Sequence, residues 1–316
     1  MINPLLIQLL SYASFLAFVI GSVLAVVRYA AMPIHLRWEL YPVAHEKGRD
    51  YGGSYLEDID WWTKPRNSSL IGELKYMGRE GLLFEQCYRR NRYLWYWTYP
   101  FHIGLLLVAF WLLLLVVGAM TLQFGGSAVS GSSTAWGRLI FYTTVGAGGL
   151  GLSLCLIGCA GLLFKRVIDP DLRLYTVPAD YLNLIITLIV LFTGCSAWLF
   201  YDRTFAVARE YVGSLIALRP ASQMNDIPSV AVVLFSFFLI YMPFSRMRHG
   251  LAKYFTYHRV RWEDKPNLRG SDLEKQIVKL LDKRVTWTAP HIQQNEKWSE
   301  LVTKAPTEQE KKADDR

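Results

Sequence analysis

Five long apolar runs constrain what this chain can fold into more than any other feature of its sequence. They lie near residues 5–27, 101–123, 138–164, 181–201 and 229–245. A helix needs about 20 apolar residues to cross a bilayer, and a backbone in lipid must satisfy its own hydrogen bonds, so each run is predicted to be a spanning helix. Five buried helices of a soluble protein would instead show polar stripes at helical spacing, which residues 105–119 and 181–192 lack. The predicted fold class is an all-α membrane protein with five transmembrane helices.

The distribution of Lys and Arg predicts the orientation of these spans. Segment 31–98 carries ten of these residues, whereas 124–137 carries none and 202–227 carries three. Loops rich in Lys and Arg stay in the cytoplasm, so we expect the N-terminus outside and the C-terminus inside, with a cytoplasmic loop and tail. The opening MINPLLIQLL lacks the basic segment and cleavage site of a signal peptide, so the first span is expected to be retained. The formal net charge of +8 follows from this topology and does not indicate nucleic-acid binding.

The topology divides the chain into four parts. These are the first transmembrane helix in 1–30, a cytoplasmic docking loop in 31–98, transmembrane helices two to five in 99–246, and a cytoplasmic helix with an extended arm in 247–316. The loop and the arm are longer than chain closure requires, which favours a docking surface for a partner protein. The alternative is that both only cover the end of the helix bundle.

Local patterns predict two helices outside the membrane. Residues 70–90 are predicted to form an amphipathic helix capped by Ser68 or Ser69, followed by aromatic residues at the membrane interface: Tyr93, Trp95, Tyr96, Trp97 and Tyr99. SDLEKQIVKLLDKRV predicts a short helix opened by Ser271. VTWTAPHIQQNEKWSEL predicts the extended arm, and the final KAPTEQEKKADDR is expected to be disordered.

Cysteines and glycines in the spans have simple packing interpretations. The four cysteines form no metal or disulfide framework. Cys155 and Cys159 are expected to pack as small apolar residues, and Cys87 to remain without a disulfide. The glycines of GAGGLG at 146–151 are expected to allow close helix packing. A transporter is disfavoured, because no span carries an acidic residue at mid-membrane or a paired Gly/Pro break.

Two of the six histidines lie at the edges of spans. His102 opens the second span and His249 closes the fifth, so antiparallel helices bring both imidazoles to the same depth near the cytoplasmic face. Two axial ligands of a haem need this arrangement, and Arg246 and Arg248 are suited to its propionates. No C-x-x-C-H motif is present, so such a haem is of b type. Alternatively, the histidines mark the interface and the arginines anchor it. His35, His45 and His258 are expected to be surface or partner-contact residues, and His291 is not expected to bind haem.

The motifs FHIG, which opens the second span, and PFSRMRH, which closes the fifth, resemble the gamma subunit of respiratory nitrate reductase. That family is a five-span membrane cytochrome b. The segments HLRWELYPVAHE and DWWTKPR and the long tail resemble a narrower branch, the gamma-like membrane subunits of redox complexes in sulfate reducers and related anaerobes. The resemblance implies menaquinone chemistry in the bundle, a bacterial or archaeal cytoplasmic membrane, and other subunits. One of these is a cytoplasmic iron–sulfur partner similar to the catalytic subunit of heterodisulfide reductase.

Carried over residue by residue, the resemblance assigns His102 and His249 to the haem nearest the cytoplasmic partner. The family's other haem uses histidines at positions occupied here by Leu112 and Ala231, neither of which can bind iron. One haem b is therefore expected, and a second would need an unexpected ligand such as His35 or His258. The expected function is electron transfer between menaquinone and the iron–sulfur partner. The alternative is a haem-free membrane anchor that recruits redox subunits.

Overall fold

The computed structural model describes residues 3–34, 43–49, 53–289 and 292–304. Five of its helices are long and apolar enough to cross a membrane. They are α1 (Pro4–Ala31), α4 (Arg92–Gln123), α5 (Ala135–Ile168), α7 (Pro178–Phe200) and α9 (Asp226–Tyr241), which continues into the 3-10 turn η4 (Met242–Phe244). The predicted all-α membrane fold with five spans is confirmed.

The other described helices are short and lie between or after the spans. They are the 3-10 helices η1 (Tyr55–Glu57), η2 (Trp61–Thr63) and η5 (Arg246–Arg248), the π-helices η3 (Arg79–Leu83) and η6 (Thr256–Arg261), and the α-helices α2 (Leu70–Gly78), α3 (Glu85–Arg90), α6 (Pro170–Leu174), α8 (Ala206–Ile216), α10 (His249–Phe255), α11 (Asp272–Leu281) and α12 (Trp298–Leu301).

The chain divides into two compact units, and each combines segments that are distant in sequence. The first unit contains Met1–Val27 and Asn67–Ala252, and so holds most of the spans. The second unit contains Arg28–Arg66 and Lys253–Arg316. The loop between the first two spans is therefore shared between the units, because residues up to Arg66 pack with the tail and residues from Asn67 pack with the bundle.

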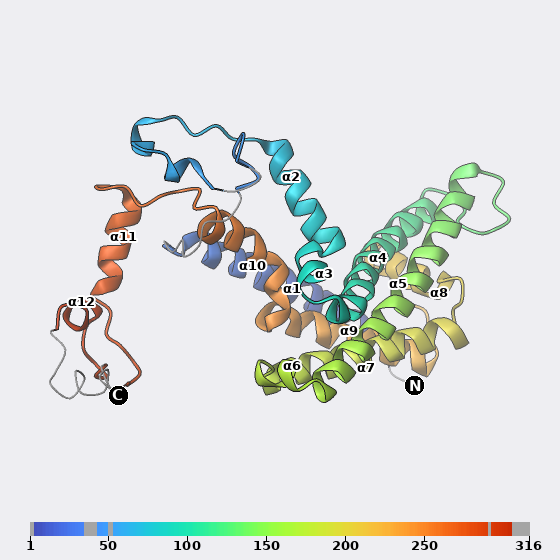
Figure 1. Ribbon diagram of the computed structural model, residues 1–316. Helices are drawn as coiled ribbons and strands as arrows, with labels where there is room; N and C mark the ends of the chain where they lie inside the picture. The colour runs from blue at the N-terminus through green and yellow to red at the C-terminus, as the bar shows by residue number, and fades with distance from the viewer. Residues whose placement is uncertain (1–2, 35–42, 50–52, 290–291, 305–316) are drawn as a thin grey trace. The chain divides into compact units, whose positions relative to one another are not determined.

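Glycines bring α4 and α5 into close contact, and the two helices lie side by side (Figure 1). A Cβ on Gly104 of α4 would lie 2.5 Å from the backbone nitrogen of Cys155, and one on Gly158 of α5 would lie 2.5 Å from the nitrogen of Phe101. The ring of Trp97 rests on Gly161 in the same way. Small residues at these positions let the backbones approach, since lipid supplies no hydrophobic force between spans.

The predicted packing roles of the GAGGLG glycines and the cysteines agree with the structure. Gly148 and Gly149 are covered by aromatic rings, and Gly151 faces the backbone of Val108. Cys155 and Cys159 are free thiols that are fully buried in the apolar core. Cys87 is also a free thiol.

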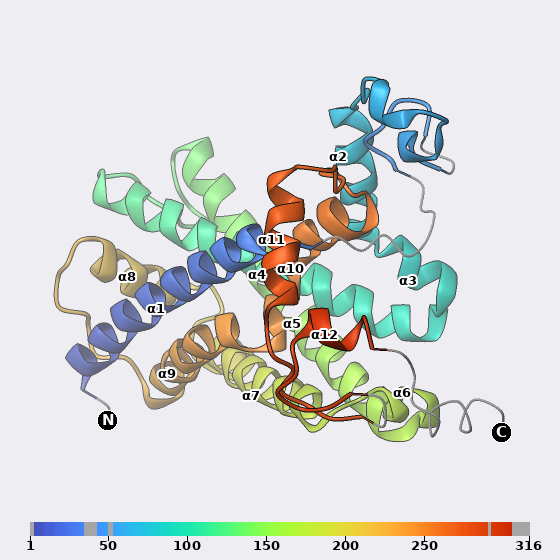
Figure 2. The same cartoon turned by 90° about the vertical axis from the view of Figure 1, so that its left-hand side faces the viewer.

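The end of the bundle formed by the α4–α5 connection is held by α8, which packs against α4. Arg209 of α8 is only 3% exposed and donates from Nη1 to the carbonyl of Ala128 at 3.0 Å. The first span joins the same end, because Gln8 donates to the carbonyl of Arg219 at 2.8 Å and Tyr12 to that of Leu215 at 2.8 Å. On the other side of the bundle, α7 and α9 pack together (Figure 2).

The predicted helix at 70–90 is interrupted. It begins as expected at Ser69, whose hydroxyl accepts from the nitrogen of Gly72 at 3.2 Å. It ends as α2 at Gly78, widens into the π-helix η3, and breaks at Phe84, whose φ of 52° is left-handed. The apolar spacing gave no sign of this break, because Phe84 is held by tertiary contacts with the bundle rather than by its own helical propensity.

The tail begins as predicted and then turns back. Ser271 caps α11, accepting from the nitrogen of Glu274 at 3.1 Å. The expected extended arm folds on itself, because the nitrogen of Val285 donates to Glu296 at 2.9 Å and the nitrogen of Trp298 donates to Lys283 at 3.1 Å. The disorder expected at the end of the chain concerns residues 305–316, which lie outside the described residues, as do His35 and His291.

Candidate functional site

The site begins with the position of His102 on α4. The helix is capped by Asn91, whose side chain accepts from the nitrogen of Leu94 at 2.9 Å, and it runs without interruption from the interfacial aromatic residues into the apolar span. His102 is half-buried, and its Nδ1 lies 2.8 Å from the carbonyl of Thr98, one turn earlier. A carbonyl can only accept, so Nδ1 carries the hydrogen and the lone pair of the neutral ring lies on Nε2.

His249 is positioned by a chain reversal at the end of the fifth span. Pro243 in η4 cannot continue the helix, and the chain passes through Ser245 and η5 before α10 starts at His249. The Nδ1 of His249 lies 3.1 Å from the carbonyl of Arg246. The same reasoning places its lone pair on Nε2, the arrangement that metal-binding histidines use.

The structure brings the two predicted histidines together. Their ring centroids are 6.1 Å apart and the ring planes are inclined by 73°. Phe84 and Phe101 flank His102, with ring centroids at 4.7 and 5.2 Å. We call this region, formed by His102, His249 and Phe84, the histidine end of the bundle.

The two predicted arginines are in different surroundings. Nη1 of Arg246 lies 3.0 and 3.2 Å from the two carboxylate oxygens of Asp180, which begins α7. Arg248 donates to the carbonyl of Pro243 at 3.5 Å.

Sequence reasoning missed three features of this end. Asp180 was not associated with Arg246, because 66 residues separate them. Phe84 was assigned to a continuous helix, although it is a non-glycine residue with positive φ after a π-helix, a conformation enriched at functional sites. Tyr241 donates to the side chain of Asn183 at 2.6 Å, which places a polar pair between α7 and α9. The start of α7, VPADY at 177–181, was the available signal for the first of these, because it places an acidic residue in the first turn of a span.

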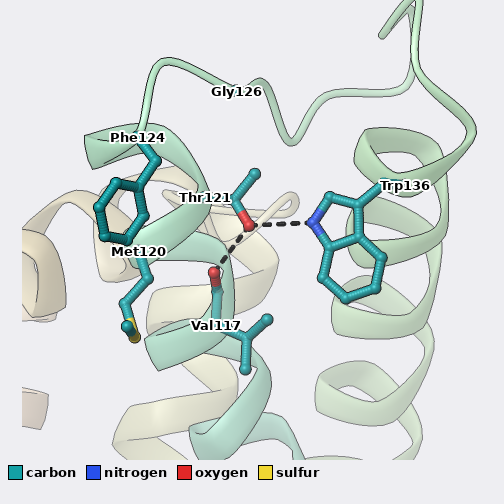
Figure 3. A pocket seen from close by; sticks show the side chains of 6 residues that line it. All are labelled: Val117, Met120, Thr121, Phe124, Gly126 and Trp136. Atoms are coloured by element: carbon teal, nitrogen blue, oxygen red, sulfur yellow. Dashed lines mark hydrogen bonds between the residues drawn. The ribbon is translucent and has the colours of Figure 1, made fainter.

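A groove of about 500 Å³ lies elsewhere on the bundle, where α4 ends and α5 begins. It is lined by Val117, Met120, Thr121, Phe124, Gly126 and Trp136. Figure 3 shows the Thr121 hydroxyl between the Trp136 indole, which donates to it at 3.1 Å, and the carbonyl of Val117, which accepts from it at 2.9 Å. Fifteen or more residues of helix, about 22 Å, separate this groove from His102, so none of the predicted site residues lines it.

Leu112 and Ala231 lie in the spans α4 and α9. Leu112 packs against the apolar core that includes Leu115, Leu152 and Phe205. Neither side chain has an atom that binds iron. No group of three or more His, Cys, Asp or Glu with metal-binding geometry occurs in the described part of the chain.

The structure contradicts the expectation that His45 and His258 are surface or partner-contact residues. They are 7% and 9% exposed, and both lie within the second unit. Each contacts the carboxylate of Asp264, at 3.0 Å from Nε2 of His45 and 2.6 Å from Nδ1 of His258. The expectation failed because both residues are flanked by charged and polar residues that themselves fold into a buried cluster.

The fold and this site define a class: a multi-pass membrane protein with a pair of histidines at one end of its bundle. Residues 85–263 match the nitrate reductase gamma subunit family, and that match includes both histidines and four of the five spans. The chain belongs to this family. It is accordingly a membrane cytochrome b subunit of a respiratory redox complex, located in the inner membrane. A search of curated proteins finds no match.

Proposed function

We propose that this chain is a one-haem cytochrome b that passes electrons between menaquinone and a cytoplasmic iron–sulfur subunit. The observation that carries the proposal is the pairing of His102 and His249 at 6.1 Å in a family of membrane cytochromes. The proposed partner is similar to the catalytic subunit of heterodisulfide reductase. The proposed relatives are the gamma-like membrane subunits of redox complexes in sulfate reducers and related anaerobes, which the loop and tail motifs resemble.

The residues present fit a haem held by two imidazoles. Two metal–nitrogen bonds of about 2 Å, with half an imidazole on either side, place ring centroids about 6 Å apart, which agrees with the separation of 6.1 Å. Both Nδ1 atoms face backbone carbonyls, so Nε2 is the nitrogen that would bind the iron. When bound, haem b supplies a one-electron carrier.

The surrounding residues support the same assignment. Arg246, whose Nη1 contacts Asp180, and Arg248 are the proposed cations for the haem propionates, since guanidinium groups form strong hydrogen bonds to carboxylates. Phe84 restrains the ring of His102 and presents an apolar surface to a porphyrin. These residues hold and orient the group, and they limit the access of water to it.

A single haem places the proposed quinone reaction near the histidine end. With leucine and alanine at positions 112 and 231, the opposite half of the bundle lacks a redox stepping stone. In the proposed orientation, N-terminus outside and C-terminus inside, quinone then reacts in the cytoplasmic half, near Tyr241 and the aromatic residues that open α4. Protons are exchanged with the cytoplasm, so this subunit alone builds no membrane potential.

An absorption spectrum of the purified full-length protein tests the central claim. We expect a reduced b-type spectrum with one haem per polypeptide, quantified against protein concentration. A protein without haem would leave the alternative, a membrane anchor that only recruits redox subunits. Two haems per chain, or quinone located by cryo-electron microscopy at the α4–α5 groove rather than near the histidine end, would contradict the one-haem account.

A further inference from the structure

One side of the short helix α2 exposes large apolar side chains. Leu70, Ile71 and Leu74 are 67%, 80% and 63% exposed. At about 3.6 residues per turn these three residues share one side of the helix. The element that α2 packs against is the π-helix η3, which directly follows it. A contiguous exposed apolar surface of this kind marks a place where a protein meets something other than water.

The apolar surface continues into η3, where Leu82 and Leu83 are also exposed. Contacts with the start of the second span fix the depth of η3. The indole of Trp95 donates to the carbonyl of Leu83 at 2.9 Å, and the ring centroid of Phe84 lies 4.7 Å from that of His102. The apolar run of α4 begins beside His102, so these contacts hold η3 at the edge of the hydrocarbon layer.

The helix α2 is oriented to lie along that edge. It runs across the direction of α4 in both views (Figure 1, Figure 2), whereas a helix that projects away from the membrane would continue the direction of the span. The connecting helix α3 folds back on the first turns of α4, where the ring centroids of Tyr88 and Trp95 are 5.1 Å apart. The whole segment therefore stays close to the point where α4 enters the lipid.

Exposed cations border the apolar surface. Lys75 is exposed and lies about 100° around α2 from Leu74. Arg90 and Arg92 are exposed where α3 ends and α4 begins. Long cationic side chains at such a border reach polar groups while their stems remain on the apolar surface, and phosphate groups of phospholipids are suitable acceptors.

We propose that residues 70–84, which we call the interfacial segment, bind the surface of the lipid bilayer. Leu70, Ile71 and Leu74 insert among the acyl chains, and Lys75 lies at the phosphate groups. Amphipathic helices with this division of apolar and cationic residues lie in the plane of the interface. Lipid is favoured over a protein partner because the contacts of η3 with α4 already bring this surface to the bilayer. The proposal does not depend on haem binding.

Nitroxide labels on the full-length protein test the proposal in nanodiscs of phosphatidylethanolamine and phosphatidylglycerol. The label is attached to Leu74→Cys in a Cys87→Ser background, because Cys87 is a native thiol that is not fully buried. Collisions of the label with oxygen, which concentrates in lipid, are compared with collisions with a water-soluble nickel chelate. We expect oxygen collisions to dominate severalfold, as they should at Leu113→Cys, an exposed position within the span α4.

Lys75→Cys, labelled in the same background, is the matched control. Nickel collisions should dominate there, because this position faces the headgroups and water. A label at Leu74→Cys that collides mainly with nickel would mean that this side faces water and is free for a protein partner. A label that collides with neither reagent would mean that protein covers this side. Either result would overturn the proposal.

A charged substitution gives a second measurement that needs no label. Leu74→Glu places a carboxylate among the acyl chains, so we expect amide hydrogen exchange in peptides from 70–84 to become about tenfold faster in the same nanodiscs, since burial of a leucine side chain contributes at least about that factor. Lys75→Gln should leave the exchange rate unchanged, because the amide stays on the polar side. Equal exchange rates in Leu74→Glu and the wild type would also overturn the proposal.

Discussion

Two pairs of histidines in this protein have nearly the same separation and opposite surroundings. At the histidine end, the rings of His102 and His249 are 6.1 Å apart, and each Nδ1 faces a backbone carbonyl. In the second unit, the rings of His45 and His258 are 6.0 Å apart, and both face the carboxylate of Asp264. The ring nitrogens of the first pair face neutral carbonyls, whereas those of the second pair face a carboxylate.

The comparison shows that the distance between two histidines does not decide their chemistry. The bundle supplies apolar neighbours such as Phe84 and Phe101, which suit a flat, apolar cofactor. The second unit supplies Glu46 and Arg66, which make a charged network. His258, which with His35 was named as an unexpected ligand for a second haem, contacts the carboxylate of Asp264 through Nδ1.

The largest expected effect is the loss of haem, which distinguishes the pair His102 and His249 from the pair His45 and His258. His102→Ala or His249→Ala should each abolish the b-type absorbance, because one imidazole is required on each side of the iron. His45→Ala and His291→Ala should leave the spectrum unaltered and serve as controls. The measurement is the amount of haem per polypeptide in each purified variant. A full haem complement in His102→Ala or in His249→Ala would show that the mutated histidine is not a haem ligand.

Truncation of the tail should affect docking by the second unit and leave the histidine end of the bundle unchanged. Deletion of 285–316 removes the hairpin that returns from Val285 to Trp298, including the exposed ring of Trp287. We expect recovery of the iron–sulfur partner by co-purification to fall severalfold while the haem content stays constant. Unchanged recovery of the complex would mean that the tail only covers the end of its own chain.

Glu46→Gln should destabilise the second unit strongly, because it leaves the guanidinium of Arg66 partly buried with a weaker partner. Breaking a buried ion pair by removing one member costs about 3 kcal/mol or more. The loss of stability is measured as a faster rate of limited proteolysis at Lys47 and Lys64. Asp272→Asn is the control, since its pair with Lys275 is exposed and contributes less than about 1 kcal/mol. Equal proteolysis rates in the two variants would show that the pair of Glu46 and Arg66 contributes no stability.

Gly104→Ala should disturb the histidine end through the packing of α4. The added Cβ would lie 2.5 Å from the nitrogen of Cys155, so α4 and α5 must separate, at a cost of about 1–3 kcal/mol. We expect haem absorbance to be lost on heating at a lower temperature than in the wild type. Gly146→Ala is the matched control, because nothing lies within 4 Å of its added Cβ. An identical thermal profile for both variants would argue against positioning of His102 by this contact.

The smallest expected effect is at acidic pH. The pKa of Asp264 is lowered in the folded protein, so its contribution is fully present above the unfolded value of about 4 and is lost as pH falls below it. Hydrogen exchange in peptides 256–264 should therefore increase below about pH 4. The increase should be absent in Asp264→Asn, and an equal increase in that variant would assign the acid sensitivity to another carboxyl group.

The spans, the starts of α2 and α11, and the pairing of His102 with His249 could be predicted from the sequence. Each depends on local information: apolar runs fix the helices, Ser69 and Ser271 fix helix starts, and the alternation of spans across a membrane places two edge histidines at one depth. The same information predicted close packing of the glycines in 146–151, which holds for Gly148, Gly149 and Gly151 but not for Gly146.

Only the tertiary structure decided the remaining contacts. The break at Phe84, the pairing of Arg246 with Asp180, and the contact of His45 with Asp264 all depend on segments separated by tens to hundreds of residues. Apolar periodicity records which face of an element is buried, but it does not record which charged residue of a distant segment will face it. For this reason the sequence alone determined the membrane bundle and its histidine pair, whereas the contact between His45 and Asp264 exists only because the folded chain brings the tail back to the loop.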